Sequence, residues 1–299
     1  MQRISQRGWR KKIRITNKYN LPQAVVDAVQ RHDHKKGNFS VTQLLKGSTE
    51  IALEMMNSDK LEMDVSDMFN MLLGTAVHKV LEEQERDGVL NEHYMETTVF
   101  AGMTVSGCAD YIDTTIKEIG DYKSCSAWKV IFKDYEDWRE QTKAYLYLWY
   151  METGELWHDA KVTAILKDFS QTDAERKTDY PKKPIVTIPF HFTDAEIFGV
   201  AERWEEKIIE VLQKLVSQDF GCCSEKERWA KPPKFALMKE GRQSAVKLYD
   251  SQEECEKAVE QNGKGFYMES RAGEDTKCDK YCVVGKCGFC PYRNAKEST

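Results

Sequence analysis

Two acidic residues and a lysine fall in two short apolar segments that read as neighbouring β-strands. Asp110 lies in the segment GCADYID, and Asp121 and Lys123 lie in the segment EIGDYKS. Side chains alternate along a strand, so Lys123 should point to the same face as Asp121. Two carboxylates at neighbouring strand ends can share a hard cation, and an ammonium group beside them can offset developing negative charge. The pattern predicts metal-assisted phosphodiester hydrolysis, with Asp110, Asp121 and Lys123 as catalytic residues.

The bulk composition is that of an ordinary soluble protein. The 299 residues suffice for one large domain or two smaller ones, with 41% hydrophobic and 31% charged residues. The formal net charge is -5, so contact with nucleic acid must come from local basic patches. One patch is the N-terminus, where the first 18 residues carry seven Lys or Arg and no acid. This segment reads either as a solvated tail or as an arm that touches phosphates.

The sequence contains no apolar signal segment and no run long enough to cross a bilayer. We therefore expect a cytoplasmic protein, in a bacterium or a phage-infected host cell, with no membrane partner. The nine cysteines are then not expected to form a disulfide framework.

The order of periodic segments predicts an α/β fold, with helices first, a sheet next, and helices again after it. Thr193 to Glu196 reads as a capping box that opens a long helix to about residue 216. The polar stretch between about residues 167 and 184 reads as an exposed loop or hairpin. The expected helices span about 21–34, 42–56, 65–86 and 135–151. The expected strands span about 94–101, 103–113, 115–122, 161–166 and 185–190.

Two further motifs lie on the helices that flank these strands. Gly74 and His78 form a Gly-x-x-x-His pattern, which places both residues on one helix face. Gln141 and Tyr145 form a Gln-x-x-x-Tyr pattern with the same spacing. Each pattern alone is weak, because a lone helical histidine is more often structural than a ligand. Their joint order around the Asp–Asp–Lys set is much less expected by chance.

That order resembles the PD-(D/E)XK nuclease superfamily, in particular its RecB-like branch, over roughly residues 40–216. The matching stretches are GTAVH, GCAD, DYK and QTKAY, and FSVTQLL resembles the opening helix of that branch. The resemblance implies a restriction-endonuclease-like core, with a central mixed sheet flanked by helices. It also implies that His78, Asp110, Asp121 and the Tyr122 carbonyl bind Mg²⁺ or Mn²⁺, and that Lys123 is catalytic. Gln141 and Tyr145 would position the DNA strand.

The C-terminal region changes character and is rich in cysteine. Cys278, Cys282, Cys287 and Cys290 fall within 13 residues. Four thiolates can hold zinc or an iron–sulfur cluster. Similar nucleases, the AddB and CRISPR-associated exonucleases, carry a 4Fe–4S cluster with one distant upstream ligand, but Ser48 and Thr49 stand at that upstream position here. Either all four ligands are terminal, or Cys222 or Cys223 supplies one, together with Cys278, Cys282 and either Cys287 or Cys290.

These features predict three regions and one leading function. The regions are a basic arm and helix (1–37), a nuclease core (38–217) and a cysteine-bound subdomain (218–299). The leading function is a Mg/Mn-dependent DNA exonuclease of recombination or repair, encoded by a phage or mobile element, with a homo-oligomer or a recombination or helicase protein as partner. The alternatives are a non-catalytic DNA-binding scaffold and a zinc-stabilised adaptor on a nuclease fold.

Overall fold

The chain divides into two compact units, residues 1–219 and 220–299. The computed structural model describes residues 13–30 and 37–297, so most of the predicted basic arm lies outside the described residues. Among the described residues, no helix is both long enough and apolar enough to span a bilayer. Near the N-terminus, β1 (Arg14–Thr16) pairs in parallel with β3 (Glu62–Asp64). α1 (Gln23–Val29) is shorter than expected and packs with η1 (Val65–Asp67).

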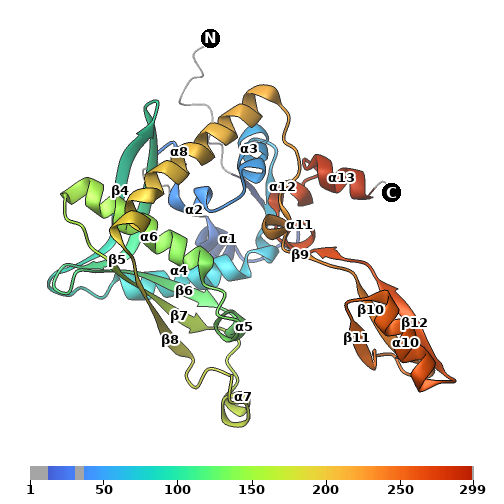
Figure 1. Cartoon of the computed structure of the whole chain (residues 1–299). Helices are drawn as coiled ribbons and strands as arrows, with labels where there is room; N and C mark the ends of the chain where they lie inside the picture. The colour runs from blue at the N-terminus through green and yellow to red at the C-terminus, as the bar shows by residue number, and fades with distance from the viewer. Residues whose placement is uncertain (1–12, 31–36, 298–299) are drawn as a thin grey trace. The chain divides into compact units, whose positions relative to one another are not determined.

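A six-stranded mixed sheet forms the centre of the first unit (Figure 1). Its order is β2-β5-β6-β7-β8, and β4 pairs with β5. The β2–β5 and β6–β7 pairs are parallel, and the other pairs are antiparallel. The predicted α/β class with a central mixed sheet is confirmed. The strands are β2 (Phe39–Ser40), β4 (Val89–Phe100), β5 (Met103–Asp113), β6 (Glu118–Cys125), β7 (Asp159–Leu166) and β8 (Ile185–His191).

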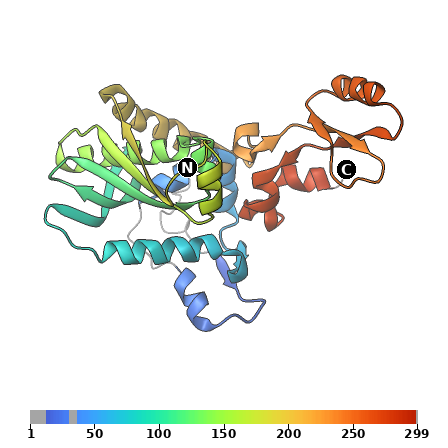
Figure 2. The same ribbon diagram turned by 90° about the horizontal axis from the view of Figure 1, so that it is seen from below.

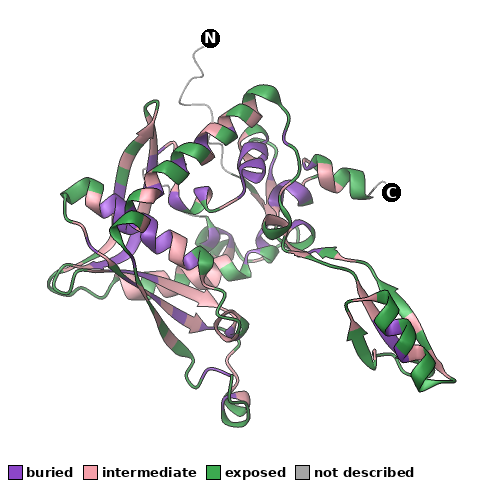
Figure 3. Ribbon diagram, viewed as in Figure 1, coloured by how far each residue is buried: buried purple, intermediate pink, exposed green. Residues whose placement is uncertain are grey.

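Helices cover both faces of this sheet. Figure 2 shows α4 (Phe69–Glu82) on one side, and α6 (Glu136–Thr153) and α8 (Asp194–Ser217) on the other. The buried residues gather between these layers, as Figure 3 shows, with Ile112, Ile119 and Leu146 fully buried. The shorter helices of this unit are α2 (Val41–Leu44), α3 (Ser48–Met56), α5 (Ala127–Ile131) and α7 (Gln171–Arg176).

The stretch between β7 and β8 differs from the expected exposed loop or hairpin. It contains α7, which Ser170 caps by accepting a hydrogen bond from the Asp173 amide. Tyr180 is buried and packs into the core beside Trp138 and Leu166. Tyr180 therefore fixes a segment whose composition is otherwise polar. The expectation of an exposed segment rested on that polar composition and did not include a buried tyrosine.

The predicted capping box of α8 is confirmed. The Thr193 side chain accepts from the Glu196 amide, and the Glu196 carboxylate accepts from the Thr193 amide. Arg139 of α6 also contacts this carboxylate, at 2.6 Å. The Thr193 backbone hydrogen bond, followed by the Arg139 hydrogen bond, lowers the pKa of Glu196 to about 2. The carboxylate thus closes the first turn of α8 and links α8 to α6.

Glu196→Gln is expected to destabilise the protein at neutral pH but not in strong acid. The folded pKa of Glu196 lies below the unfolded value of 4.5, so its contribution is present above that value and is lost as the pH falls towards about 2. Thermal unfolding across this range should show the difference in Tm between wild type and variant shrinking as the pH falls. Glu202→Gln, at an exposed position of the same helix, is the control. A difference that grows in acid would contradict the assignment.

The second unit contains two structural parts. β9 (Ala230–Lys231) and β13 (Glu274–Asp275) pair antiparallel, and the cysteine-bearing helices follow β13. Between these two strands lies a three-stranded antiparallel sheet on which one helix packs, with Leu237 and Cys255 in its core. Its elements are β10 (Lys234–Lys239), β11 (Lys247–Tyr249), α10 (Gln252–Asn262) and β12 (Phe266–Arg271). The remaining helices are α9 (Glu225–Arg228), α11 (Thr276–Lys280), α12 (Val283–Lys286) and α13 (Pro291–Glu297).

Candidate functional site

The candidate site lies at a fork in the central sheet. β4 covers one edge of β5, so β2 and β6 share the other edge. β2 pairs with β5 at residues 105–106, and β6 pairs with it at residues 111–113. Residues 107–110 between them have no strand partner on that edge within the described part of the chain. The Asp110 carboxylate accepts a hydrogen bond from the Tyr122 amide at 2.5 Å. Where the backbone pairing of β5 with β6 ends, the Asp110 side chain thus takes the place of a backbone acceptor.

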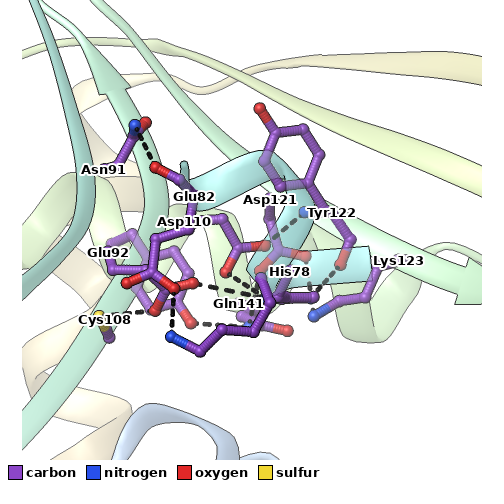
Figure 4. A network of polar contacts seen from close by, with 12 residues as sticks. His78, Glu82, Asn91, Glu92, Cys108, Asp110, Asp121, Tyr122, Lys123 and Gln141 are labelled. Atoms are coloured by element: carbon purple, nitrogen blue, oxygen red, sulfur yellow. Dashed lines mark hydrogen bonds and ion pairs between the residues drawn. The ribbon is translucent and has the colours of Figure 1, made fainter. Parts of the chain in front are cut away.

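Three potential metal ligands converge at this fork (Figure 4). The structure brings together His78 of α4, Glu92 of β4 and Asp110 of β5, each with one ligand atom within 4.8 Å of the others. His78 Nδ1 lies 3.3 Å from Asp110 and 3.5 Å from Glu92. Hydrogen bonds to Asp110 and then to Glu92 raise the pKa of His78 to about 10. His78 is therefore a cation in this arrangement and balances the two carboxylates.

The second carboxylate of the motif forms a buried ion pair. Asp121 is 2% exposed, and its Oδ2 lies 2.7 Å from the Lys123 ammonium. Burial raises the pKa of Asp121 to about 6, although Lys123 opposes this. Burial by itself would lower the pKa of Lys123, but the Asp121 carboxylate outweighs it and the net change is upward. Lys123 therefore stays protonated and cannot serve as a general base in this state.

Gln141 and Tyr145 lie behind Asp121. Gln141 donates to Asp121 Oδ1 at 3.1 Å and to the Tyr145 hydroxyl at 2.7 Å. Both side chains are buried, and burial raises the pKa of Tyr145 well above its usual value. Their predicted contact with a DNA strand stays a prediction. In this structure they orient the Asp121 carboxylate from the α6 side of the sheet.

α4 runs alongside β6 and sets the position of His78. His78 Nε2 lies 3.1 Å from the Tyr122 carbonyl. One turn earlier, a methyl group added at Gly74 would lie 3.8 Å from Ser124 Oγ. Four residues of a helix rise about 6 Å, and two residues of an extended strand rise about 6.6 Å. His78 and Gly74 of α4 can therefore lie beside Tyr122 and Ser124 of β6, respectively. The Tyr122 carbonyl, predicted as a metal ligand, here faces the histidine ring.

Each aspartate of the motif follows a glycine that lies under a tyrosine ring. A Cβ added at Gly107 would lie 2.7 Å from the Tyr145 ring. A Cβ added at Gly120 would lie 1.8 Å from the Tyr111 ring, which crosses from the paired strand. The glycines therefore let two aromatic rings pack directly on the backbone beside the carboxylates.

The donor set fits a hard divalent cation. Asp110 and Glu92 offer carboxylate oxygens, and His78 offers an imidazole nitrogen that Mn²⁺ accepts more readily than Mg²⁺ does. Oδ2 of Asp121 is buried and faces the Lys123 ammonium at 2.7 Å. Glu92 was not predicted from the sequence. The strand expected at about 94–101 began two residues after Glu92, whereas β4 begins at Val89.

The cysteines of the second unit form a second constellation. Burial and the neighbouring Cys282 and Cys290 thiols raise the pKa of Cys278 to about 11. Burial also raises the pKa of Cys222, and the Cys290 thiol adds to this rise. Cys278 is thus within electrostatic reach of Cys282 and Cys290, and Cys222 is within reach of Cys290. The Cys282 sulfur also accepts from the Gly285 amide at 3.5 Å, which caps α12.

Two buried polar atoms beside these cysteines have no hydrogen-bond partner among the described residues. They are Nε of Arg228 and Oγ1 of Thr276. Arg228 lies 3.6 Å from Asp275, which precedes the helix that carries Cys278. Buried donors without acceptors are rare in native proteins and often mark an ion or group that is not described. Sulfur atoms of a bound cluster or metal thiolate would supply such acceptors.

Comparisons with known proteins gave distant structural similarities only. No family model matches the chain, and no curated protein matches it. The protein SSO0001 is similar over 62% of this chain and 82% of its own, with 14% identity and a TM-score of 0.44. An alkaline exonuclease from Laribacter hongkongensis is similar over 60% of this chain and 90% of its own, with 10% identity and a TM-score of 0.38. A phage related exonuclease from Haemophilus somnus 129PT is similar over 70% of this chain and 97% of its own, with 13% identity and a TM-score of 0.36.

Proposed function

We propose that the chain is a Mg/Mn-dependent deoxyribonuclease that acts as an exonuclease in recombination or repair. The observation that carries this proposal is the fork in the sheet. There Asp110, Glu92 and His78 converge, and the buried Asp121–Lys123 pair lies on the adjoining strand. The order of the motifs resembles that of RecB-like nucleases. On that resemblance we also propose a phage or mobile-element origin and a recombination or helicase partner.

Each residue of the candidate site has a separate role in the proposed hydrolysis. Asp110 and Glu92 would hold a cation through oxygen, and His78 through Nδ1 after losing its proton. Such a cation polarises the phosphate and lowers the pKa of a bound water. Lys123 keeps its proton, so its role is to stabilise negative charge that develops on the phosphate rather than to remove a proton. Gln141 fixes the orientation of Asp121, which in turn holds the Lys123 ammonium in place.

The test is nucleotide release from end-labelled DNA. Linear duplex, linear single-stranded and closed-circular DNA are each incubated with Mn²⁺, with Mg²⁺ and with EDTA, under reducing and anaerobic conditions. The proposal expects metal-dependent release from the linear substrates and none from circles. Cleavage of circles would show an endonuclease instead. No release from any substrate, with DNA binding retained, would favour the non-catalytic scaffold.

For the second unit we propose a 4Fe–4S cluster, with zinc as the alternative, held by four cysteines. The favoured set is Cys222, Cys278, Cys282 and Cys290, because Cys278 interacts electrostatically with Cys282 and Cys290, and Cys222 interacts with Cys290. The unpartnered Arg228 Nε and Thr276 Oγ1 beside them support a bound group with sulfur acceptors. Cys223 and Cys287 are the alternative ligands. All six cysteines belong to the unit of residues 220–299, so the bound group would cross-link that unit internally.

Metal content and single substitutions test this assignment. The anaerobically purified protein should contain about four iron atoms per chain and a broad visible absorption band. Stoichiometric zinc in a colourless protein would select the adaptor-type site instead. Cys222→Ser and Cys290→Ser should lose metal and lower Tm, because the energy of binding a structural metal is also folding energy. Cys223→Ser and Cys287→Ser should retain the metal. The reverse pattern would identify these two as the ligands.

A further inference from the structure

An exposed aromatic pair lies on the short helix that follows the strand of Asp121 and Lys123. Trp128 is 55% exposed and Phe132 is 72% exposed. Their ring centroids are 5.6 Å apart at an interplanar angle of 24°, so the rings are stacked. The rest of α5 packs inward, with Ala127 buried and Val130 in contact with the core. The two rings are therefore the outward face of a helix whose other face is already occupied.

Hydrogen bonds between the ends of β6 and β7 hold this helix in place. Asp168 follows β7 and accepts from the Ala127 amide at 2.7 Å and from the Ser126 hydroxyl at 2.5 Å. The Lys167 amide donates to the Cys125 carbonyl at 3.0 Å. Because β6 carries Lys123, the rings have a fixed position relative to the candidate active site. Trp128 lies five residues beyond Lys123 along the chain.

Two lysines, Lys129 and Lys133, directly follow the two aromatic residues along the chain. The Lys129 ammonium already has partners within the protein, because it lies 2.7 Å from the Asp137 carboxylate and over the Trp138 ring. Lys133 directly follows Phe132 and is exposed, and no ion pair is found for its ammonium among the described residues. The Lys167 ammonium contacts the neutral Asn70 side chain, so its charge is not cancelled there. Lys133 is thus an exposed basic residue next to Phe132 along the chain, and the exposed Asp134 follows it.

Flat exposed rings with an adjacent basic residue match single-stranded nucleic acid. Such proteins combine aromatic platforms for bases with positive charge for the backbone, and stacking contributes about 1–3 kcal/mol per base. A stable protein partner is a poorer fit. A specific protein interface buries at least about 1,000 Å² in total, whereas one aromatic side chain buries about 150–250 Å². Two rings on a short helix therefore suit a base better than a folded domain.

We propose that Trp128 and Phe132 stack on an unpaired base of the DNA strand whose phosphodiester is cleaved at the fork. This inference rests on the proposed nuclease function and extends it to substrate choice. A paired base presents its face only to its neighbours in the duplex, so the platform needs an unpaired end. The protein should therefore favour single-stranded DNA and frayed or overhanging ends over fully paired blunt ends.

Binding without turnover tests the platform separately from the chemistry. A fluorescein-labelled single-stranded oligonucleotide is titrated in EDTA and followed by anisotropy. Trp128→Ala and Phe132→Ala should each weaken binding by about 5-fold or more, and Trp128→Phe should retain most of it. Phe198→Ala is the control, because Phe198 is also exposed, pairs with Tyr150 and lies on α8. Circular dichroism confirms that each variant is folded.

An abasic ligand series locates the contact. Removing one base at a time should weaken wild-type binding at one or two positions, and at those positions Trp128→Ala should cause no further loss. If the double variant Trp128→Ala, Phe132→Ala binds the intact oligonucleotide as tightly as wild type, the platform is overturned. If the variants lose binding but wild type releases no nucleotides with metal, the platform stands and the nuclease proposal fails. Wild-type cleavage that the double variant matches on every substrate would overturn the platform alone.

Discussion

Asp110→Asn is expected to lower metal-dependent nucleotide release by more than about 100-fold, because even outer partners of metal ligands contribute about 10–100-fold. Asparagine keeps the shape of the side chain, and its amide oxygen can still accept the Tyr122 N–H. It lacks the charge that would hold a cation between His78 and Glu92. The measurements are the initial rate of release and the increase in Tm on adding Mn²⁺, and both should be lost.

Asp113→Asn is the matched control for this experiment. Asp113 lies at the end of the same strand and accepts from the Thr115 amide and hydroxyl in the following turn. Its replacement should leave both the rate and the Mn²⁺ effect close to wild type. Asp110→Asn that retains the Mn²⁺-dependent rise in Tm would remove Asp110 from the metal site. A lost rate with a retained rise in Tm would instead assign Asp110 to a step after metal binding.

The motif order was readable from the sequence because each motif is local. The i, i+4 spacing put Gly74 and His78 on one helix face, and the period-2 alternation put Asp121 and Lys123 on one strand face. The long strands and helices were found for the same reason, since each has a strong period of its own. The sheet class followed from their order, and the structure confirms it.

Glu92 was missed because the expected strand began at about residue 94, and its place beside Asp110 also depends on an irregularity in the β4–β5 hairpin. The hairpin turn at Ala101 and Gly102 pairs Phe100 with Met103. A one-residue bulge between Thr98 and Phe100 then shifts the register. Extrapolating the pairing from the turn would place Glu92 opposite Tyr111. With the bulge, the pairs Asn91–Tyr111 and His93–Ala109 place Glu92 level with Asp110, and Glu92 itself has a left-handed backbone with a φ of 47°.

The roles of Gln141 and Tyr145 show a different limit. Helical spacing predicted that they share a face, and it could not say whether that face meets solvent or the core. In the structure both are buried, and Tyr145 packs over Gly107. Their contribution to the site is the orientation of Asp121. The burial of these two side chains depends on how α6 packs on the sheet. That packing involves residues far apart in the sequence, so local spacing does not reveal it.

Gly120→Ala is expected to destabilise the first unit by about 1–3 kcal/mol or more, the range typical of overpacking a tight site. The new methyl group would lie 1.8 Å from the Tyr111 ring. That ring cannot move freely, because Tyr111 is 8% exposed, its ring centroid lies 5.5 Å from that of Tyr122, and its hydroxyl donates to Glu118 at 3.0 Å. Chemical unfolding measures the change in free energy. Since Gly120 precedes Asp121, the rate of nucleotide release should fall as well.

A double-mutant cycle separates this clash from a general intolerance of side chains near the site. Tyr111→Ala removes the ring, so the double variant should be more stable than the sum of the two single losses predicts, with a coupling of about 0.5–3 kcal/mol. Gly74→Ala is the control, because a Cβ added there would lie 3.8 Å from Ser124 Oγ, which is an ordinary contact distance. That change should raise stability by about 0.5–1 kcal/mol, as alanine favours a helix interior over glycine. Strictly additive losses in the cycle would mean that the Tyr111 ring does not pack on the Gly120 backbone, and that the path of β6 into Asp121 is set by something else.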